Sequence, residues 1–338
     1  QTHTYFREEV HNLKLDYTRP FAEVWKLEGG FQYSNNDVSN DFEVKDELAG
    51  VWVVNPGLTN VFEFTQGVLG IYGMMAYESD PWGVQLGLRT ENTRVNTVLV
   101  NTLEKNDQDY TDLFPSLNTS YKFSNSFSVQ AGYSRRIYRP RLWDLNPFFN
   151  IRNSYNYRQG NPDLRAEYSD SYELSAIFIK GIASFNMSLY QLFTTNTIES
   201  VTTFKDNISV RAPENLGTKR VNGIEINTKI NAGQKIVING DFNFNGFDRK
   251  AIWQERSFDF KGNSWFSEIT SKFKLPKNLD TEFSWNYQSR FKTIDGETLP
   301  SQYFNIGVRK KLLKGKGIIS FNIRDIFASR VRENRTIR

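Results

Sequence analysis

The sequence has no cysteine, and it has only 3 methionines and 2 histidines among its 338 residues. Without cysteine the chain can form neither a disulfide nor a thiolate metal site. Both histidines, His3 and His11, lie near the N-terminus, so a Ser-His-Asp catalytic site would have to use one of them. Because no other catalytic pattern stands out, we expect a protein that is not an enzyme.

Long hydrophobic runs and blocks of like charge are also missing. No apolar segment approaches the roughly 18 residues of a transmembrane helix, and none forms the core of a signal peptide. The 42 Lys+Arg nearly balance the 38 Asp+Glu, and the longest basic run is Arg309-Lys310-Lys311, so we expect no nucleic-acid partner. A phosphate-binding glycine loop and a zinc-ligand spacing are absent as well, so we expect no cofactor and no metal.

Aromatic residues are abundant, at 15% of the chain, and apolar and polar side chains alternate along many segments. At 283–290, for example, Phe283, Trp285 and Tyr287 alternate with polar residues. This period of two predicts β-strands with one apolar face, and convincing amphipathic helices are absent. The expected strands, about 14 in number, lie near 11–18, 24–35, 61–79, 82–98, 112–123, 127–138, 168–180, 182–196, 219–232, 235–247, 262–275, 279–292, 301–312 and 317–325.

The lengths of these strands and of their connections point to a membrane. Most strands have about 10–15 residues, whereas five or six are typical of soluble sheets, and about 9–11 suffice to cross a bilayer at a tilt. Short turns alternate with long loops, as they do in outer-membrane barrels. The long loops are expected near 36–60, 99–111, 139–167, 197–218 and 248–261, with a shorter one at 293–300.

These patterns together predict an all-β fold, an antiparallel transmembrane β-barrel, rather than a soluble sandwich or propeller with one wet face. The apolar face of each strand would contact lipid, and the face rich in Ser, Asn, Gln, Lys and Glu would line an aqueous or plugged lumen. Segment 42–54 is placed in a long loop, and the alternative for it is an extra strand.

Several short motifs follow one another in a fixed order along the chain. They are QLGLRTE at 85–91, FPSL at 114–117, YSRR at 133–136 with Arg139-Pro140, LNPF at 145–148, GNPDL at 160–164, Glu167, SYEL at 171–174 and NIRDIFASR at 322–330. In this order they resemble the C-terminal barrel of TonB-dependent outer-membrane receptors, and more narrowly the outer-membrane β-barrel family common in Bacteroidetes. The resemblance covers most of 61–330, and any single motif would be a weak signal.

The resemblance implies a barrel of about 22 strands in the bacterial outer membrane, with an N-terminal plug domain inside it. Receptors of this kind import scarce ligands, powered by the TonB complex through a short TonB box. This sequence shows about 14 strands and neither a plug nor a TonB box, and it ends without the expected terminal aromatic strand. We therefore expect residues 1–338 to form a single, partial outer-membrane barrel domain of a larger receptor.

The candidates for ligand binding gather around Tyr138 and in the long loop after it. Arginine combined with aromatic rings suits anionic chelates, peptide carboxylates and sugar rings. The alternative is that the arginines pair with acids of the barrel wall or plug, and that the aromatic residues only pack the loop down. The turn at Asn161-Pro162-Asp163 is expected to be structural. The candidate residues are Arg135, Arg136, Arg139, Arg141, Trp143, Phe148, Phe149, Tyr155, Tyr157 and Arg158.

Three functions remain open on the sequence. The first is a TonB-dependent receptor for a siderophore, peptide or glycan. Its partners would be the plug domain, the TonB complex, outer-membrane lipid or lipopolysaccharide, and a surface lipoprotein. The second is a stand-alone porin-like or fatty-acid-type channel of about 14 strands, which needs neither plug nor energy. The third is a soluble β-rich carbohydrate-binding module.

Overall fold

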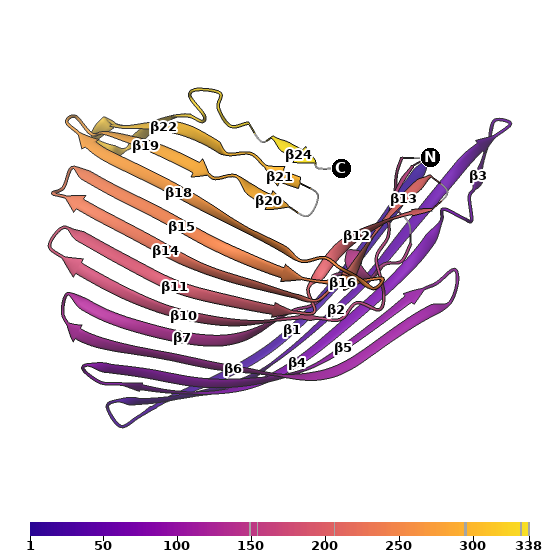
Figure 1. The fold of residues 1–338 in the computed structure, drawn as a ribbon, viewed down its shortest axis with the longest axis horizontal. Coiled ribbons are helices and arrows are strands. Elements are labelled where there is room, and N and C mark those ends of the chain that lie inside the picture. Colours follow the sequence, from indigo (N-terminus) through magenta and orange to yellow (C-terminus); the bar gives the residue numbers. More distant parts are fainter. Residues whose placement is uncertain (149, 154, 206, 294–295, 332, 337–338) are drawn as a thin grey trace.

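The computed structural model describes residues 1–148, 150–153, 155–205, 207–293, 296–331 and 333–336. One large antiparallel sheet curves through the whole molecule (Figure 1). Within the described residues the helical segments are α1 (Leu142–Leu145) and the 3-10 turn η1 (Leu313–Gly315). No helix in this part of the chain has the length and apolar character needed to cross a membrane.

In the described residues, the main path of the large sheet, called the wall below, contains 14 strands in the order of the chain, each paired antiparallel with the next. Short turns join the strands at one end, and most connections at the other end are longer, the exception being the short 100–103 between β5 and β6 (Figure 1). Each expected strand is present, which confirms the all-β barrel prediction. The strands are β1 (Thr2–Phe21), β2 (Trp25–Leu48), β4 (Asn60–Glu78), β5 (Trp82–Leu99), β6 (Glu104–Ser124), β7 (Phe127–Tyr138), β10 (Glu167–Lys180), β11 (Ala183–Thr195), β14 (Thr218–Ala232), β15 (Ile236–Lys250), β18 (Phe260–Leu275), β19 (Leu279–Gln288), β22 (Ser301–Leu312) and β23 (Gly317–Ile323).

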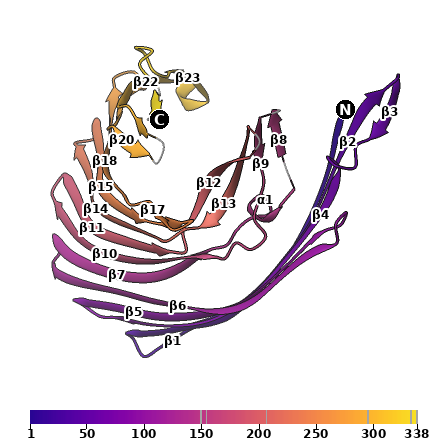
Figure 2. The ribbon, with the colours of Figure 1, turned by 45° about the vertical axis from the view of Figure 1, so that its right-hand side comes forward.

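The connections and the segment after β23 carry shorter strands. One group forms a four-stranded sheet in the order β12-β13-β9-β8, called the inner sheet below. It lies on the concave side of the wall (Figure 2). These shorter strands are β3 (Val51–Val54), β8 (Asn150–Asn153), β9 (Asn156–Arg158), β12 (Ile198–Lys205), β13 (Ile208–Asn215), β16 (Ile252–Trp253), β17 (Arg256–Ser257), β20 (Phe291–Thr293), β21 (Gly296–Thr298) and β24 (Asn334–Thr336).

Two of the expected long loops are wrong because wall strands continue into them, whereas 197–218 and 248–261 are connections that carry short strands of their own. Most of 36–60 is strand, because β2 continues to Leu48 and β3 folds back onto it. Most of 99–111 is strand as well, because β6 begins at Glu104. Apolar alternation marks a strand only where one face meets lipid or a core. The start of β6 is polar on both faces, and in the extended part of β2 the apolar positions, such as Val38 and Phe42, are few and face the interior. The ladder therefore continues there without a clear hydrophobic signal.

Segment 42–54 is therefore not a loop, and the alternative of an extra strand is correct. Residues 42–48 end β2, and β3 pairs with them through contacts such as Leu48↔Val51. Because β3 lies off the main path and pairs with β2, the strand order of the wall is unchanged.

The two faces of the wall differ as the alternation predicts. On the convex face of β5, Leu86 and Leu88 are 48% and 53% exposed. On its concave face, Glu91 and Thr93 are almost fully covered, because a loop residue contacts both from inside. The exterior is thus apolar and the interior polar. Further apolar side chains exposed on the convex face are Leu13, Leu15, Ile71, Leu113, Leu174, Leu189, Phe283 and Phe321.

A small apolar core lies inside the curve, where the loop after β7 meets the wall. Its wall side chains come from the parts of β2, β4 and β5 that face the loop. Its loop side chains come from α1 and from the turn before β10, and Phe148 and Ile198 pack against it. The core holds the loop against the wall. Its members are Val38, Phe62, Phe64, Val95, Leu99, Leu142, Leu145 and Leu164.

Candidate functional site

Two connections fold into the concave side of the wall and form one unit, called the inner assembly below. The first, 139–166, carries α1, β8 and β9, and the second, 196–217, carries β12 and β13. The parallel pairing of β9 with β13 joins the two connections within the inner sheet. Figure 2 shows this unit rising inside the curve of the wall. Seven of the ten sequence candidates belong to its described residues.

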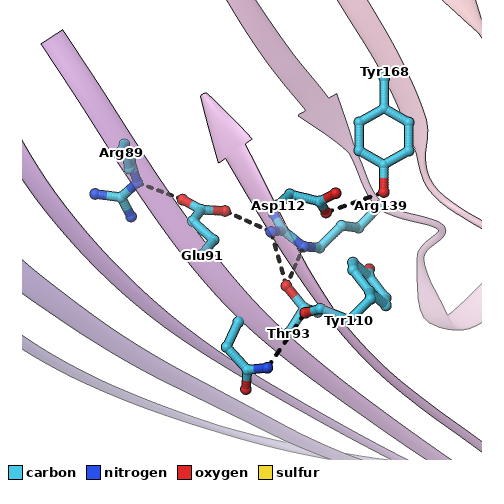
Figure 3. Close-up of polar contacts among 8 residues, drawn as sticks. Arg89, Glu91, Thr93, Tyr110, Asp112, Arg139 and Tyr168 are labelled. Atoms are coloured by element: carbon cyan, nitrogen blue, oxygen red, sulfur yellow. Dashed lines mark hydrogen bonds and ion pairs between the residues drawn. The ribbon is translucent and has the colours of Figure 1, made fainter. Parts of the chain in front are cut away.

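Arg139 anchors the first connection to the wall (Figure 3). Its Nη2 donates to Glu91 Oε2 at 2.5 Å, and its Nε and Nη2 donate to Thr93 Oγ1 at 3.1 and 2.9 Å. The other carboxylate oxygen of Glu91 accepts from Arg89 Nε at 2.5 Å. Glu91 is thus held between two guanidinium groups in a nearly buried place. Arg139 thus pairs with an acidic residue of the wall, which is the alternative to ligand binding given for the arginines.

Two tyrosine hydroxyls, of β7 and β10, donate to carboxylates on other wall strands. Tyr168 donates to Asp112 at 3.0 Å (Figure 3), and Tyr133 donates to Asp170 at 2.8 Å. The guanidinium of Arg135 lies over the Tyr168 ring at 5.3 Å, which is a cation–π distance. Arg135 is therefore on the wall beside the inner assembly and not within it.

The helix α1 divides the candidates near it into two kinds. Its leucines, Leu142 and Leu145, are buried in the core. Arg141 lies over the Tyr138 ring at 5.9 Å, and its backbone N–H donates to the carboxylate of Asp144 at 3.1 Å. Trp143 points the other way and stacks on Phe6 of β1, with ring centroids 6.1 Å apart. Trp143 is 54% exposed and so keeps one accessible ring face.

The turn at 160–163 is structural, as expected. Asn161 Oδ1 accepts the backbone N–H of Asp163 at 3.0 Å, and Asn161 Nδ2 donates to Pro213 O and Glu214 Oε2 at 3.2 and 3.1 Å. A Cβ at Gly160 would lie 2.6 Å from backbone atoms of Asn146, so this approach needs glycine. The turn thereby ties the first connection to β13.

The turn also changes the pKa of Glu214 on β13. Burial, together with the nearby charge of Asp163, raises the pKa of the Glu214 carboxyl above its ordinary value, and the hydrogen bond from Asn161 opposes that rise. The raised pKa means that the folded turn binds a proton more readily than the unfolded chain does.

The second connection is pinned to the wall on both sides. The backbone N–H of Ile198 donates to the carboxylate of Glu167 at the start of β10. Arg249 of β15 donates to Glu199 Oε1 at 2.7 Å. Because β12 and β13 connect neighbouring wall strands, these contacts keep the inner sheet folded back into the interior.

The remaining candidates lie at different depths. Phe148 packs on Phe42, with ring centroids 6.1 Å apart, so its ring helps to hold the loop down. Arg136 is exposed on β7, and Tyr155 is exposed just before β9. Tyr157 and Arg158 lie on β9 and line a cavity of about 680 Å³. Phe149 lies outside the described residues.

Sequence reasoning missed Arg211, which lies directly opposite Arg158 on β13. The two residues are far apart in sequence, and a parallel pairing between two loop strands leaves no periodic signal. Within the described part of the chain, no group of three or more His, Cys, Asp or Glu residues could hold a metal ion. Of the candidates, Tyr157 and Arg158 thus lie together with Arg211 on the inner sheet, which is cationic and partly aromatic there.

Comparisons with solved structures agree with this architecture. The copper transporter OprC matches with a TM-score of 0.77 at 10% identity, over 98% of this chain and 53% of that one. The ferric yersiniabactin uptake receptor FyuA from Yersinia pestis has a TM-score of 0.68 at 11% identity, over 96% and 50%. The ferric citrate transporter FecA has a TM-score of 0.69 at 13% identity, over 96% and 50%. The chain spans about half the length of these proteins, and the likeness concerns the fold.

Comparisons of sequence give two further results. No curated protein matches the chain. The family model described as "Outer membrane protein beta-barrel family" matches residues 1–338. The apolar convex face and the polar concave face are those of a wall between lipid and water, in keeping with the bacterial outer membrane. The chain belongs to the outer membrane protein beta-barrel family.

Proposed function

We propose that this chain forms part of the barrel of a TonB-dependent receptor, which takes up a scarce ligand of the siderophore, peptide or glycan class. The observation that carries the proposal is the inner assembly, a folded, ion-paired lining inside a wall whose fold is that of metal and siderophore transporters. A passive pore needs an open lumen, whereas a receptor needs binding surface inside the barrel.

The polar concave face supports a plug domain as partner. Lys26, Glu28 and Glu173 line an interior cavity of about 550 Å³ near the short turns, together with Ser175 and Gln130. Charged and amide side chains in this position need water or a protein partner. A plug held there would be displaced by the TonB complex, and lipid or lipopolysaccharide would cover the convex face. A surface lipoprotein would meet the barrel on the side of the long connections.

The stand-alone channel fits the fold less well. In the described residues β1 pairs with β2 alone and β23 with β22 alone, so these 14 strands do not close on themselves. An open sheet edge in lipid leaves backbone N–H and C=O groups without hydrogen-bond partners. Each such group costs on the order of several kcal/mol, as for other buried polar groups. The soluble module fits poorly too, because a soluble protein rarely exposes an apolar face of this extent.

Energised uptake is the test. Cells that carry the protein, cells that lack it and cells that lack TonB are supplied separately with labelled ferric chelates, oligopeptides and oligosaccharides. We expect uptake of one class to require both the protein and TonB, and to stop when a protonophore removes the membrane potential. Uptake that needs the protein but continues without TonB would replace the receptor with a passive channel.

A further inference from the structure

The inner sheet places two arginines side by side on one face. β9 runs parallel to β13 with Arg158 opposite Arg211, and β12 runs antiparallel to β13 with Thr202 opposite Arg211. Residues at directly opposed positions point to the same side of a sheet. The two guanidinium groups therefore extend over the same surface, with a threonine hydroxyl beside them.

This surface is hollow. The cavity of about 680 Å³ has two arginines and no acidic residue in its lining. A smaller cavity of about 200 Å³ shares Arg158, Ser200 and Arg211 and reaches the wall at Tyr138 and Glu167, with Asp144 beside it. The two cavities together form a site with Arg158 and Arg211 toward one end and the carboxylates of Glu167 and Asp144 at the other. The lining of the larger cavity is Asn156, Tyr157, Arg158, Ser200, Thr202, Phe204, Ser209 and Arg211.

The two arginines differ from the other inward-facing arginines in their partners. Arg139 pairs with Glu91, and Arg249 pairs with Glu199. Among the residues that the structure describes, neither Arg158 nor Arg211 forms an ion pair with a carboxylate. Like charges at opposed strand positions are destabilising, so the pair costs stability unless an anion lies between the guanidinium groups.

From this geometry we infer that the Arg158–Arg211 face binds a small ligand through anionic oxygen groups, carboxylate or phosphate. This inference rests on the proposed function, since the ligand would be the cargo of the receptor. A guanidinium binds such groups with two parallel hydrogen bonds. The hydroxyls of Ser200 and Thr202 lie beside them as donors for the remaining oxygens.

The surroundings also orient the ligand. The ring of Phe204 is 80% exposed at the cationic end and can stack on a planar part of the ligand. Glu167 and Asp144, at the other end, repel anionic groups and accept hydrogen bonds from hydroxyl or ammonium groups. A volume of about 680 Å³ lies in the range of small-molecule sites, about 300–1,000 Å³. The ligand is therefore a small molecule with its anionic end toward Arg158 and Arg211.

Binding to the purified protein tests the inference. Protein extracted from outer membranes into detergent is titrated calorimetrically with citrate, with inorganic phosphate and with maltose as a neutral probe. We expect citrate or phosphate to bind and maltose not to bind. Citrate alone would assign a carboxylate ligand, and phosphate alone a phosphate ligand. Equal binding of maltose, or no binding of either anion, would overturn the inference.

Variants locate the site. The double variant Arg158→Gln and Arg211→Gln should weaken anion binding by about 10- to 100-fold or more, since it removes several charge-assisted hydrogen bonds. With lysine at both positions, the affinity for the anion should lie between those of the unmodified protein and the glutamine variant. Lysine keeps the positive charge but cannot form the two parallel hydrogen bonds of a guanidinium. Arg165→Gln is the matched control, an exposed arginine of the same connection that lines neither cavity, and it should bind as the unmodified protein does. Unchanged anion binding in the double variant, with its far-ultraviolet spectrum intact, would rule the site out.

The binding test is separable from the uptake test. Titration of purified protein needs no TonB and no membrane potential, so a passive channel could still show the anion site. Energised uptake of a neutral ligand would support the receptor while the anion site fails.

Discussion

At the scale of single residues, the inner assembly depends on Arg139 more than on its neighbours. Arg139→Ala would leave Glu91 nearly buried with Arg89 as its remaining cation. Loss of one partner from a buried ion pair costs about 3–5 kcal/mol. We expect residues 139–166 to undock and to be cleaved much faster by trypsin, while the wall strands stay protected.

The control for this prediction is Arg136→Ala. Arg136 is exposed on β7 three residues earlier and forms no ion pair within the described structure. It should leave the cleavage rate of 139–166 unchanged. Equal protection of the loop in the Arg139 and Arg136 variants would mean that the apolar core alone holds the loop in place.

The apolar convex face predicts a depth-dependent cost for charge. Leu189 lies midway along β11 and is 48% exposed, whereas Phe185 lies two residues from the start of the strand. Arginine on a lipid face costs about 2–4 kcal/mol at the midplane and about 0–1 near the interface. In a folding titration from urea into lipid, Leu189→Arg should therefore destabilise the barrel far more than Phe185→Arg.

Asn186→Arg provides the comparison on the concave face, where Asn227 of β14 lies opposite. It should have little effect, because its neighbours are polar. If Leu189→Arg proved as mild as Asn186→Arg, the convex face of β11 would not lie in lipid.

At the scale of secondary structure elements, the contact between the 160–163 turn and β13 should depend on pH. Because the pKa of Glu214 is raised in the folded turn, the folded state binds more protons than the unfolded chain between the ordinary and the raised value. Docking of the turn is then most stable below this window and weakens as pH rises through it. Hydrogen exchange of Asp163 and Leu164 amides should speed up across the window beyond the intrinsic pH effect.

Glu214→Gln removes the titration while keeping an oxygen for the hydrogen bond from Asn161. Its exchange rates should lack the extra pH dependence. If the unmodified protein and this variant gave the same profile, the protonation of Glu214 would not influence docking.

The same scale shows what the sequence could and could not predict. Wall strands such as β7, β11 and β19 have one lipid-facing side, so their alternation is strong and their positions were predicted well. The extended part of β2 and the start of β6 have no lipid-facing side, so the alternation that marks a strand is weak there. The inner sheet could not be predicted, because it needs β9 to meet β13 about fifty residues later, in parallel. For the same reason Arg158 was a candidate and Arg211 was not.

At the scale of the whole molecule, the proposed function predicts the size of the native protein. The 338 residues amount to 39.3 kDa, and they span about half of the transporters with this fold. Outer membranes run on a gel with and without boiling should show a heat-shifting band well above 39.3 kDa. A heat-shifting band near that mass would instead favour a small stand-alone pore, and no membrane band would favour a soluble protein.

The register of the wall limits how this protein can change in evolution. Side chains alternate between lipid and interior, so one inserted residue within a wall strand would exchange the two faces for the rest of that strand. The shift between β6 and β7 occurs at Lys122 and Ser124, beside a short turn, where few positions follow. Wall strands can therefore lengthen only in pairs of residues or at their ends. The inner assembly lies between wall strands, and its loops outside the inner sheet can gain or lose single residues without this exchange. Under the proposed receptor function, the ligand-binding surface could then change while the wall stays the same.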